Sequence, residues 1–343
     1  MKSFYGIKES DLKDELVSLG YSKFSSSQIF DWVYRKKVKD FNLMSNIKKE
    51  LREYLVSNYS LELPKIDKKE VSSDNTTKYL LRLYDNSLIE TVLMYHDYGI
   101  SLCVTSEVGC NMGCAFCASG LFKKKRELEA SEMVSEIMTV EEDSNVKIGH
   151  IVIMGIGEPL DNFENVMNFI DIINSPKGLE IGIRHITMST CGIVPKIYEL
   201  ADLNLGINLA ISLHAPNDEI RNKLMPISKR YKLSDLIEAI KYYYDKTKRR
   251  ITFEYLMLDG INDSKENANE LSDLLRGLNQ YVNLIPYNEV KEFEFKTSKV
   301  DSVNVFYDTL KKRGINVTRR RKMGGDIDAA CGQLRAKQLK GEV

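Results

Sequence analysis

Three cysteines lie within eight residues of this chain, in the run GCNMGCAFC: Cys110, Cys114 and Cys117. Three close thiolates can hold a cubane iron–sulfur cluster by three of its four iron atoms, because cysteine thiolates are the usual cluster ligands. The fourth iron is then open to a small molecule, which can receive an electron there. The spacing therefore predicts chemistry that begins with an electron transfer.

Two other metal sites use clustered cysteines. A structural zinc site needs four ligands, usually in two separated pairs, whereas here three cysteines crowd together with no histidine nearby. A ferredoxin-type cluster would need a further Cys-Pro, which the sequence does not contain. The spacing favours the cluster with an open iron.

Other unusual segments follow short apolar stretches of the sequence. The glycines of Gly155-Ile156-Gly157-Glu158 would let a ligand approach the backbone closely, and Glu158 could accept hydrogen bonds from a ligand ammonium. Four polar residues end further apolar stretches and could either contact the same ligand or simply line the interior of the fold: Ser189, Ser212, His214 and Asn288. By residue type alone, Cys103, Cys191 and Cys331 are small buried thiols.

The elements that must position these residues alternate along the chain. Short apolar stretches predict strands at 101–105, 150–154, 185–189, 208–213, 251–257 and 281–285. Helix-spaced apolar residues lie between them, at 131–142, 165–174, 195–203, 234–245 and 265–275, and again at 303–312 before a strand-like piece at 315–319. Such alternation predicts a parallel sheet curled into a full or partial (βα)6 barrel. Barrel chemistry occurs at the C-terminal ends of the strands, where the cysteines and polar segments fall.

Two regions precede the predicted barrel. Residues 1–65 contain helix-spaced apolar residues at 26–37 and 47–55, which predict a small separate helical domain. Residues 67–78 are polar and indicate a linker, and 79–84 and 88–94 flank a turn, which predicts a hairpin. The expected organisation is a helical domain at 1–65, a linker and hairpin at 66–99, and a catalytic barrel with a C-terminal extension at 100–343.

Composition limits the class of protein. The 343 residues include 49 Lys and Arg and 49 Asp and Glu, so a chain that is basic all over is excluded. Basic runs at 123–126, 248–250 and 319–322 would individually be solvated faces, but together they indicate contact with an RNA backbone. No apolar run reaches the ~18 residues of a membrane span, and residues 1–20 show no secretory signal. We expect a cytoplasmic protein, where clustered cysteines usually mean metal or catalysis.

Seven ordered motifs carry a family resemblance: the cysteine triplet with GIGEPLDN, STCGIVPKI, AISLHAPND, LMPIS, NLIPYN and GGDIDAACGQL. The triplet resembles the radical S-adenosylmethionine superfamily. The set resembles the RlmN-type methyltransferases, which act on carbon-2 of an adenine in the peptidyl transferase centre of 23S rRNA and in the anticodon loop of tRNA. The resemblance implies a radical SAM barrel, a 4Fe-4S cluster on the triplet and two molecules of S-adenosylmethionine per turnover. It also implies a monomer that receives electrons from a flavodoxin or ferredoxin. The implied S-adenosylmethionine contacts are Gly157, Glu158, Ser189, Ser212, Leu213, His214 and Asn288.

Carbon-2 of adenine is electron-poor and has no lone pair, so it cannot attack a methyl sulfonium, whereas a radical can add to it. In the implied mechanism Cys331 first takes a methyl group and becomes S-methylcysteine. A 5′-deoxyadenosyl radical then removes a hydrogen from that methyl, and the methylene radical adds to carbon-2. Glu90 removes the carbon-2 proton, and Cys103 forms a disulfide with Cys331 that releases the methylated RNA.

Three alternatives stay open at this stage. A sister enzyme methylates carbon-8 of the same ribosomal adenine and gives antibiotic resistance; Pro159 after Glu158 disfavours it, because that group has Ala there. A non-catalytic RNA-binding protein with a structural metal would carry the same cysteines. Glu90 could also be an ordinary exposed strand carboxylate.

Overall fold

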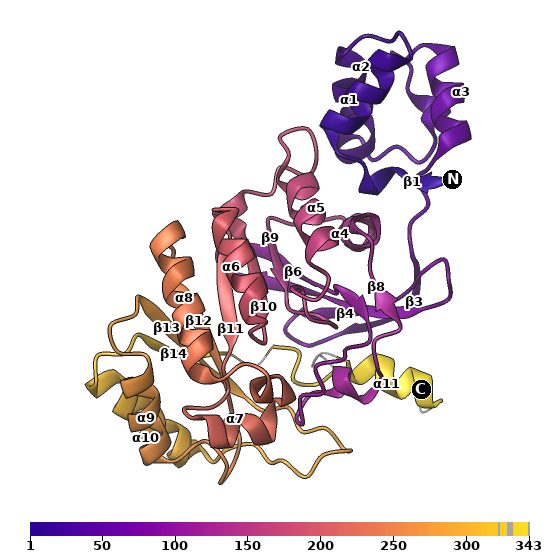
Figure 1. The fold of residues 1–343 in the computed structure, drawn as a ribbon. Coiled ribbons are helices and arrows are strands. Elements are labelled where there is room, and N and C mark those ends of the chain that lie inside the picture. The colour runs from indigo at the N-terminus through magenta and orange to yellow at the C-terminus, as the bar shows by residue number, and fades with distance from the viewer. Residues whose placement is uncertain (322, 328–331, 342–343) are drawn as a thin grey trace.

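A computed structural model describes residues 1–321, 323–327 and 332–341. Its centre is a ten-stranded sheet in the order β14-β13-β12-β11-β10-β9-β6-β5-β4-β3 (Figure 1). Seven neighbouring strands run parallel: β6 (Gly99–Val104), β9 (His150–Ile153), β10 (Ile186–Thr190), β11 (Asn208–Ser212), β12 (Ile251–Met257), β13 (Gln280–Pro286) and β14 (Val317–Arg319). The six predicted barrel strands all form within two residues of their expected ends, and the strand-like piece at 315–319 adds the seventh.

Helices connect the parallel strands and cover the outer face of the curled sheet (Figure 1). They are α4 (Ala130–Ser144), α5 (Phe163–Asn174), α6 (Val194–Asp202), α7 (Asp218–Leu224), α8 (Leu233–Thr247), α9 (Lys265–Leu274) and α10 (Val300–Lys312). In α5 the buried residues Phe163, Val166, Ile170 and Ile173 recur at helix spacing, so one face packs on the sheet. Because each crossover returns to the same edge, the C-terminal ends of the strands meet there. The predicted partial (βα)6 barrel is confirmed.

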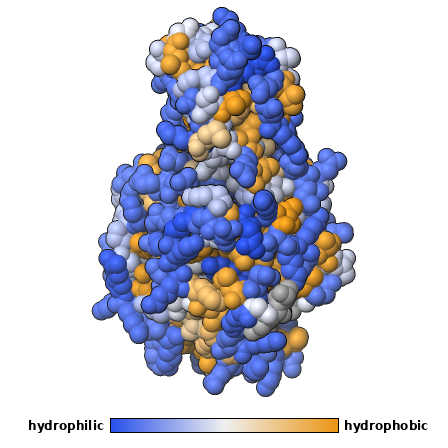
Figure 2. Space-filling model, turned by 90° about the vertical axis from the view of Figure 1, so that its right-hand side faces the viewer, coloured by the Kyte–Doolittle hydropathy of each residue, from blue (hydrophilic) through white to orange (hydrophobic). Residues whose placement is uncertain are grey.

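The N-terminal residues form a small helical lobe that stands on the larger body (Figures 1 and 2). Its helices are α1 (Glu9–Ser18), α2 (Phe24–Phe30), which continues as a π-helical turn at Asp31–Arg35, and α3 (Lys49–Asn58). The ring of Phe4 packs against the rings of Phe30 and Tyr59, with centroids 5.5 and 5.7 Å apart. Ion pairs from Lys37 to Glu141 (2.9 Å) and Lys8 to Asp171 (3.0 Å) join the lobe to α4 and α5.

Residues 65–96 extend the barrel sheet. β3 (Lys65–Val71), β4 (Thr77–Arg82) and β5 (Leu88–His96) are antiparallel, and β5 pairs with β6. The hairpin prediction is confirmed, but the segment 67–78 is largely strand β3 and a tight turn, and not a linker. Its polar composition reflects an edge strand with one solvent-facing side, and charged side chains such as Lys68 and Lys69 protect such an edge from further pairing.

The C-terminal tail returns to this hairpin. The backbone N–H of Gly324 donates to Asp74 (3.0 Å), and Asp326 accepts from the N–H of Ser73 (3.0 Å) and from the hydroxyl of Ser72. After residues 328–331, which lie outside the described part of the chain, α11 (Gln333–Lys340) packs on β5 and on the short helix η4 (Ala118–Leu121). None of the described helices is long and apolar enough to cross a membrane.

Candidate active site

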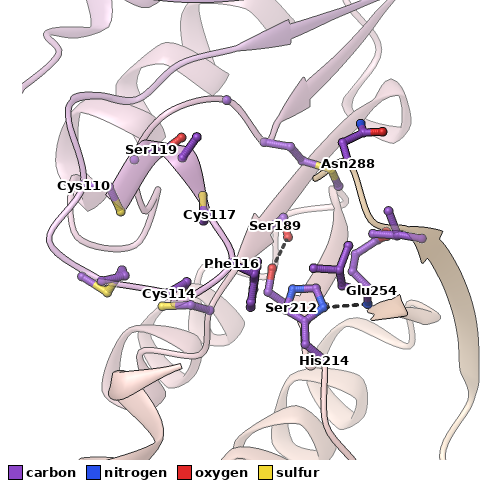
Figure 3. Close-up of a pocket in the computed structure, with 18 of the residues that line it drawn as sticks. Cys110, Cys114, Phe116, Cys117, Ser119, Ser189, Ser212, His214, Glu254 and Asn288 are labelled. Carbon is purple, nitrogen blue, oxygen red and sulfur yellow. Dashed lines mark hydrogen bonds between the residues drawn. The ribbon is translucent and has the colours of Figure 1, made fainter. Parts of the chain in front are cut away.

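A cavity of about 370 Å³ opens at the C-terminal ends of the parallel strands (Figure 3). Nine residues that the sequence singled out line it: Cys110, Cys114, Cys117, Gly157, Glu158, Ser189, Ser212, His214 and Asn288. They come from the ends of five different strands, so only the barrel brings them together. One common site at the barrel mouth is what the alternation of strands and helices predicted.

The three cysteines lie on the loop that leaves β6 and face the cavity (Figure 3). The N–H of Cys117 donates to the carbonyl of Cys114 (3.2 Å), and the N–H of Ala115 donates to the carbonyl of Leu224 at the end of α7 (2.9 Å). Burial raises the pKa of Cys110 to about 12 and that of Cys114 well above its usual value. These thiols therefore need a nearby positive charge to become thiolates.

The cysteine loop fits an iron–sulfur cluster. Iron supplies the positive charge that buried thiolates need, and a coordinating metal deprotonates a thiol outright. Among the described residues no group of three or more His, Cys, Asp and Glu side chains converges on a point where one metal ion would bind. A cubane cluster does not require such convergence, because its thiolate ligands bind three separate iron atoms. Cys110, Cys114 and Cys117 would hold it.

The Gly-Ile-Gly-Glu segment leaves β9 in a conformation that requires glycine. Gly157 has a φ of +111°, and a Cβ at this position would lie 2.7 Å from the side chain of Glu107. The Glu158 carboxylate accepts hydrogen bonds from the N–H groups of Cys191 (2.7 Å) and Leu160 (3.0 Å). Glu158 thus ties the ends of β9 and β10 together.

The ends of β10 and β11 present hydroxyl and imidazole groups. The Oγ atoms of Ser189 and Ser212 lie 3.2 Å apart. The Nδ1 atom of His214 accepts from the N–H of Leu256 (3.0 Å), which leaves the proton on Nε2. Burial lowers the pKa of His214 to about 3, so the ring is a neutral donor. Leu213 lies outside the cavity lining, with its side chain in the core.

Two acceptors complete the wall on the side of β12 and β13. The Oδ1 atom of Asn288 is buried with no hydrogen-bond partner among the described residues, which is typical of a group that awaits a ligand. Glu254 lines the cavity with 5% of its surface exposed, and Asn283 donates to it at 3.2 Å. Sequence reasoning missed Glu254, although a carboxylate inside the apolar strand ITFEYLM was a usable signal.

Glu90 lies beside the cavity on β5. It is 3% exposed and forms an ion pair with the fully buried Lys78 (2.8 Å), so the interpretation as an exposed strand carboxylate is wrong. Its carboxylate also accepts from the backbone N–H groups of Gly332 (2.6 Å) and Arg335 (2.5 Å) at the start of α11. Glu90 therefore fixes the tail directly after Cys331, which itself lies outside the described residues.

Cys103 is buried on β6, opposite Val92 of β5. It packs against Val92 and Met94, and both of these line the cavity. The strand pairing thus places Cys103 on the same face of the sheet as Val92, which lies two residues along β5 from Glu90.

The three basic runs have different surroundings. Lys124 is paired with Asp161 (2.6 Å) and Arg126 with Glu132 (2.6 Å), so the run at 123–126 is largely neutralised within the chain. The run at 248–250 precedes β12, at the opposite end of the strands from the cavity. Arg320 and Arg321 of the third run line the cavity, which makes them the basic residues best placed for a polyanionic substrate.

Comparison with known proteins agrees with the geometry. Residues 104–271 match the family described as Radical SAM superfamily, and residues 3–61 match the ribosomal RNA large subunit methyltransferase N-terminal domain. A crystal structure of a radical SAM methyltransferase from Sphaerobacter thermophilus is similar to the chain with a TM-score of 0.92 and 40% identity, over 98% of this chain and 100% of that one. Fold and site together define a radical SAM methyltransferase.

Curated relatives give the family. The chain is 51% identical, over 98% of its length and 99% of the relative, to the probable dual-specificity RNA methyltransferase RlmN of Acholeplasma laidlawii. It is 52% identical to the protein of the same description from Bacillus thuringiensis, over 99% and 95% of the two chains. The chain belongs to the RlmN family of radical SAM RNA methyltransferases. Membership of the superfamily implies a 4Fe-4S cluster and S-adenosylmethionine.

Proposed function

We propose that this enzyme methylates carbon-2 of an adenine in 23S rRNA and in tRNA through a methyl group carried on Cys331. The relatives named as dual-specificity RNA methyltransferases support the choice of RNA. The observation that carries the proposal is the anchoring of Gly332, the neighbour of Cys331. Its N–H donates to Glu90 (2.6 Å), and a Cβ at this glycine would lie 2.6 Å from the backbone nitrogen of Ser119, two residues after Cys117.

The cavity residues would hold S-adenosylmethionine. The hydroxyls of Ser189 and Ser212, the Nε2–H of His214 and the unpartnered Oδ1 of Asn288 offer donors and acceptors around one apolar cavity. The backbone at Gly157 allows close approach because no side chain fits there. These are the contacts that a ligand with a ribose, a purine and an amino acid needs.

The covalent steps fall on Cys331. Its thiolate attacks the methyl carbon of one S-adenosylmethionine, so that the methyl group moves to Cys331 and S-adenosylhomocysteine leaves. When bound on Cys110, Cys114 and Cys117, the cluster would supply one electron for the cleavage of a second S-adenosylmethionine into methionine and a 5′-deoxyadenosyl radical, and would accept one electron in return when the RNA adduct is oxidised. The methyl on Cys331 loses a hydrogen atom to that radical, which becomes 5′-deoxyadenosine. The resulting methylene forms a carbon–carbon bond with carbon-2.

Release of the product would use Glu90 and Cys103. A carboxylate has about four lone-pair sites, and Lys78, Gly332 and Arg335 occupy three of those on Glu90, so one remains for the carbon-2 proton. The Cys103 thiolate forms an S–S bond with Cys331 while the sulfur–methylene bond breaks. The electron pair passes to the methylene carbon, which takes a proton and becomes the methyl group. Two electrons delivered by thiol exchange then reduce the disulfide.

Two partners follow from this scheme. The side chains of Arg320 and Arg321 would contact RNA phosphates at the rim of the cavity, and the helical lobe would add to the RNA grip. A flavodoxin or ferredoxin would supply the electrons.

The experiment is to digest rRNA and tRNA from cells with and without the gene and to locate the methyl group by mass spectrometry. We expect 2-methyladenine only when the gene is present, and its loss in Cys331→Ala. In Cys103→Ala we expect the reaction to stall as a covalent protein–RNA adduct. A methyl group at carbon-8 alone, or full methylation by Cys331→Ala, would refute the proposal.

A further inference from the structure

Arg221 is a buried cation that forms no ion pair with a carboxylate of the described residues; Asp218, on the same helix, acts on it only at longer range. Arg221 lies on α7 and is fully buried, yet its three hydrogen-bond acceptors are neutral backbone carbonyls. Nη2 donates to the carbonyls of Cys191 (2.7 Å) and Ser212 (3.3 Å), and Nε donates to that of Leu213 (3.3 Å). The Nη1 atom is buried with no hydrogen-bond partner among the described residues.

Such an arrangement is costly unless an anion is present. An isolated buried charge loses its hydration, and proteins normally compensate it with an ion pair or a metal site. Lys78, which is equally buried, shows the usual solution in its ion pair with Glu90 at 2.8 Å. Arg221 therefore indicates a negatively charged group that binds beside it.

The cysteine loop is where that charge would lie. The helix that carries Arg221 ends at Leu224, whose carbonyl accepts from the N–H of Ala115, between Cys114 and Cys117. Burial lowers the pKa of Arg221, and three neighbours act on that pKa in the opposite direction: Cys191, Cys114 and Asp218. Two of the carbonyls that hold the guanidinium belong to Cys191 and Ser212, which line the cavity, so the charge is fixed behind the cavity lining.

We propose that Arg221 is the fixed counter-charge of the iron–sulfur cluster, and that it is a positioning residue which favours the thiolates and the reduced cluster. Three thiolates around a [4Fe-4S]²⁺ core give a net charge of −1, and reduction makes it −2. A fixed positive charge stabilises the reduced cluster, with its charge of −2, more than the oxidised cluster, with its charge of −1. The low dielectric of the cavity strengthens this effect. The inference rests on the cluster of the superfamily and not on which RNA position is methylated.

The test compares Arg221→Lys, which keeps the charge, with Arg221→Gln, which keeps N–H donors without it. Both side chains are shorter than arginine, so the pair separates charge from shape. Each protein is reconstituted anaerobically, its iron and sulfide content is measured, and its cluster is titrated with reductant and followed by electron paramagnetic resonance. The control variant is Arg249→Gln. Arg249 lies just before β12, far from the cysteine loop, and donates a hydrogen bond to Asn208.

We expect Arg221→Lys and the control to titrate near the unmodified enzyme. At the midpoint potential of Arg221→Lys, we expect the ratio of reduced to oxidised cluster to be at least tenfold lower in Arg221→Gln, which corresponds to a midpoint lower by about 59 mV for one electron. Loading of the cluster by the Lys variant but not by the Gln variant would also support the charge. Equal loading with equal midpoints would overturn the proposal. Failure of both variants to load would overturn it too, because the shape of the guanidinium would then be what matters.

Discussion

Replacing Lys78 by methionine should destabilise the protein far more than an ordinary surface change. Lys78 is fully buried and pairs with Glu90 at 2.8 Å, and removing one member of a buried ion pair leaves the other charge uncompensated. Such a loss costs about 3–5 kcal/mol in the free energy of unfolding. The matched control is Lys340→Met, whose ion pair with Glu292 is partly exposed and should contribute about 0–1 kcal/mol.

The assay is urea unfolding of both variants, with hydrogen exchange of residues 332–341 as a local readout. Glu90 also holds the N–H groups of Gly332 and Arg335, so exchange at the start of α11 should become faster in Lys78→Met. Adding Glu90→Gln should recover part of the lost stability, because no uncompensated carboxylate then remains. A change within 1 kcal/mol of the Lys340→Met control, or further destabilisation in the double variant, would refute the reasoning.

Three further predictions concern the cavity and the RNA surface. Gly157→Ala should lower the urea midpoint markedly, because its methyl group would overlap Glu107 at a φ of +111°. The pKa of His214 is about 3 in the folded protein and about 6.5 in the unfolded chain. Between these values the unfolded state binds more protons, so the free energy of unfolding falls as the pH drops through that range. The free energy of unfolding of His214→Gln should lack this one-proton dependence on pH. Arg321→Ala should weaken RNA binding and reduce the salt slope of log Kd by about 1, as filter binding at several salt concentrations would show, whereas Lys248→Ala at the other end of the barrel should do neither.

The barrel strands were predictable from the sequence because strands buried on both faces appear as continuous apolar runs. The residues at their C-terminal ends followed from that, since parallel strands end at one edge. β3 was missed because a polar edge strand has the composition of a linker. The roles of Arg221 and Glu254 were missed for a different reason. DEIRNKL has the composition of an exposed helical turn, and only the packing of α7 against the ends of β10 and β11 buries its arginine.

The C-terminal tail, which includes α11, is held in place by side chains that are distant in the sequence. Asp74 and Ser72 on the β3–β4 turn bind Gly324 and Asp326, while Glu90 on β5 binds the segment after Cys331. The hairpin and the tail therefore form one structural unit, although 242 positions separate Glu90 from Gly332 in the sequence. We expect the two segments to be exchangeable between relatives only together. A chimaera that takes only the tail from a relative should lose the position of Cys331, the residue that we propose carries the methyl group, whereas one that takes residues 65–96 together with the tail should keep it.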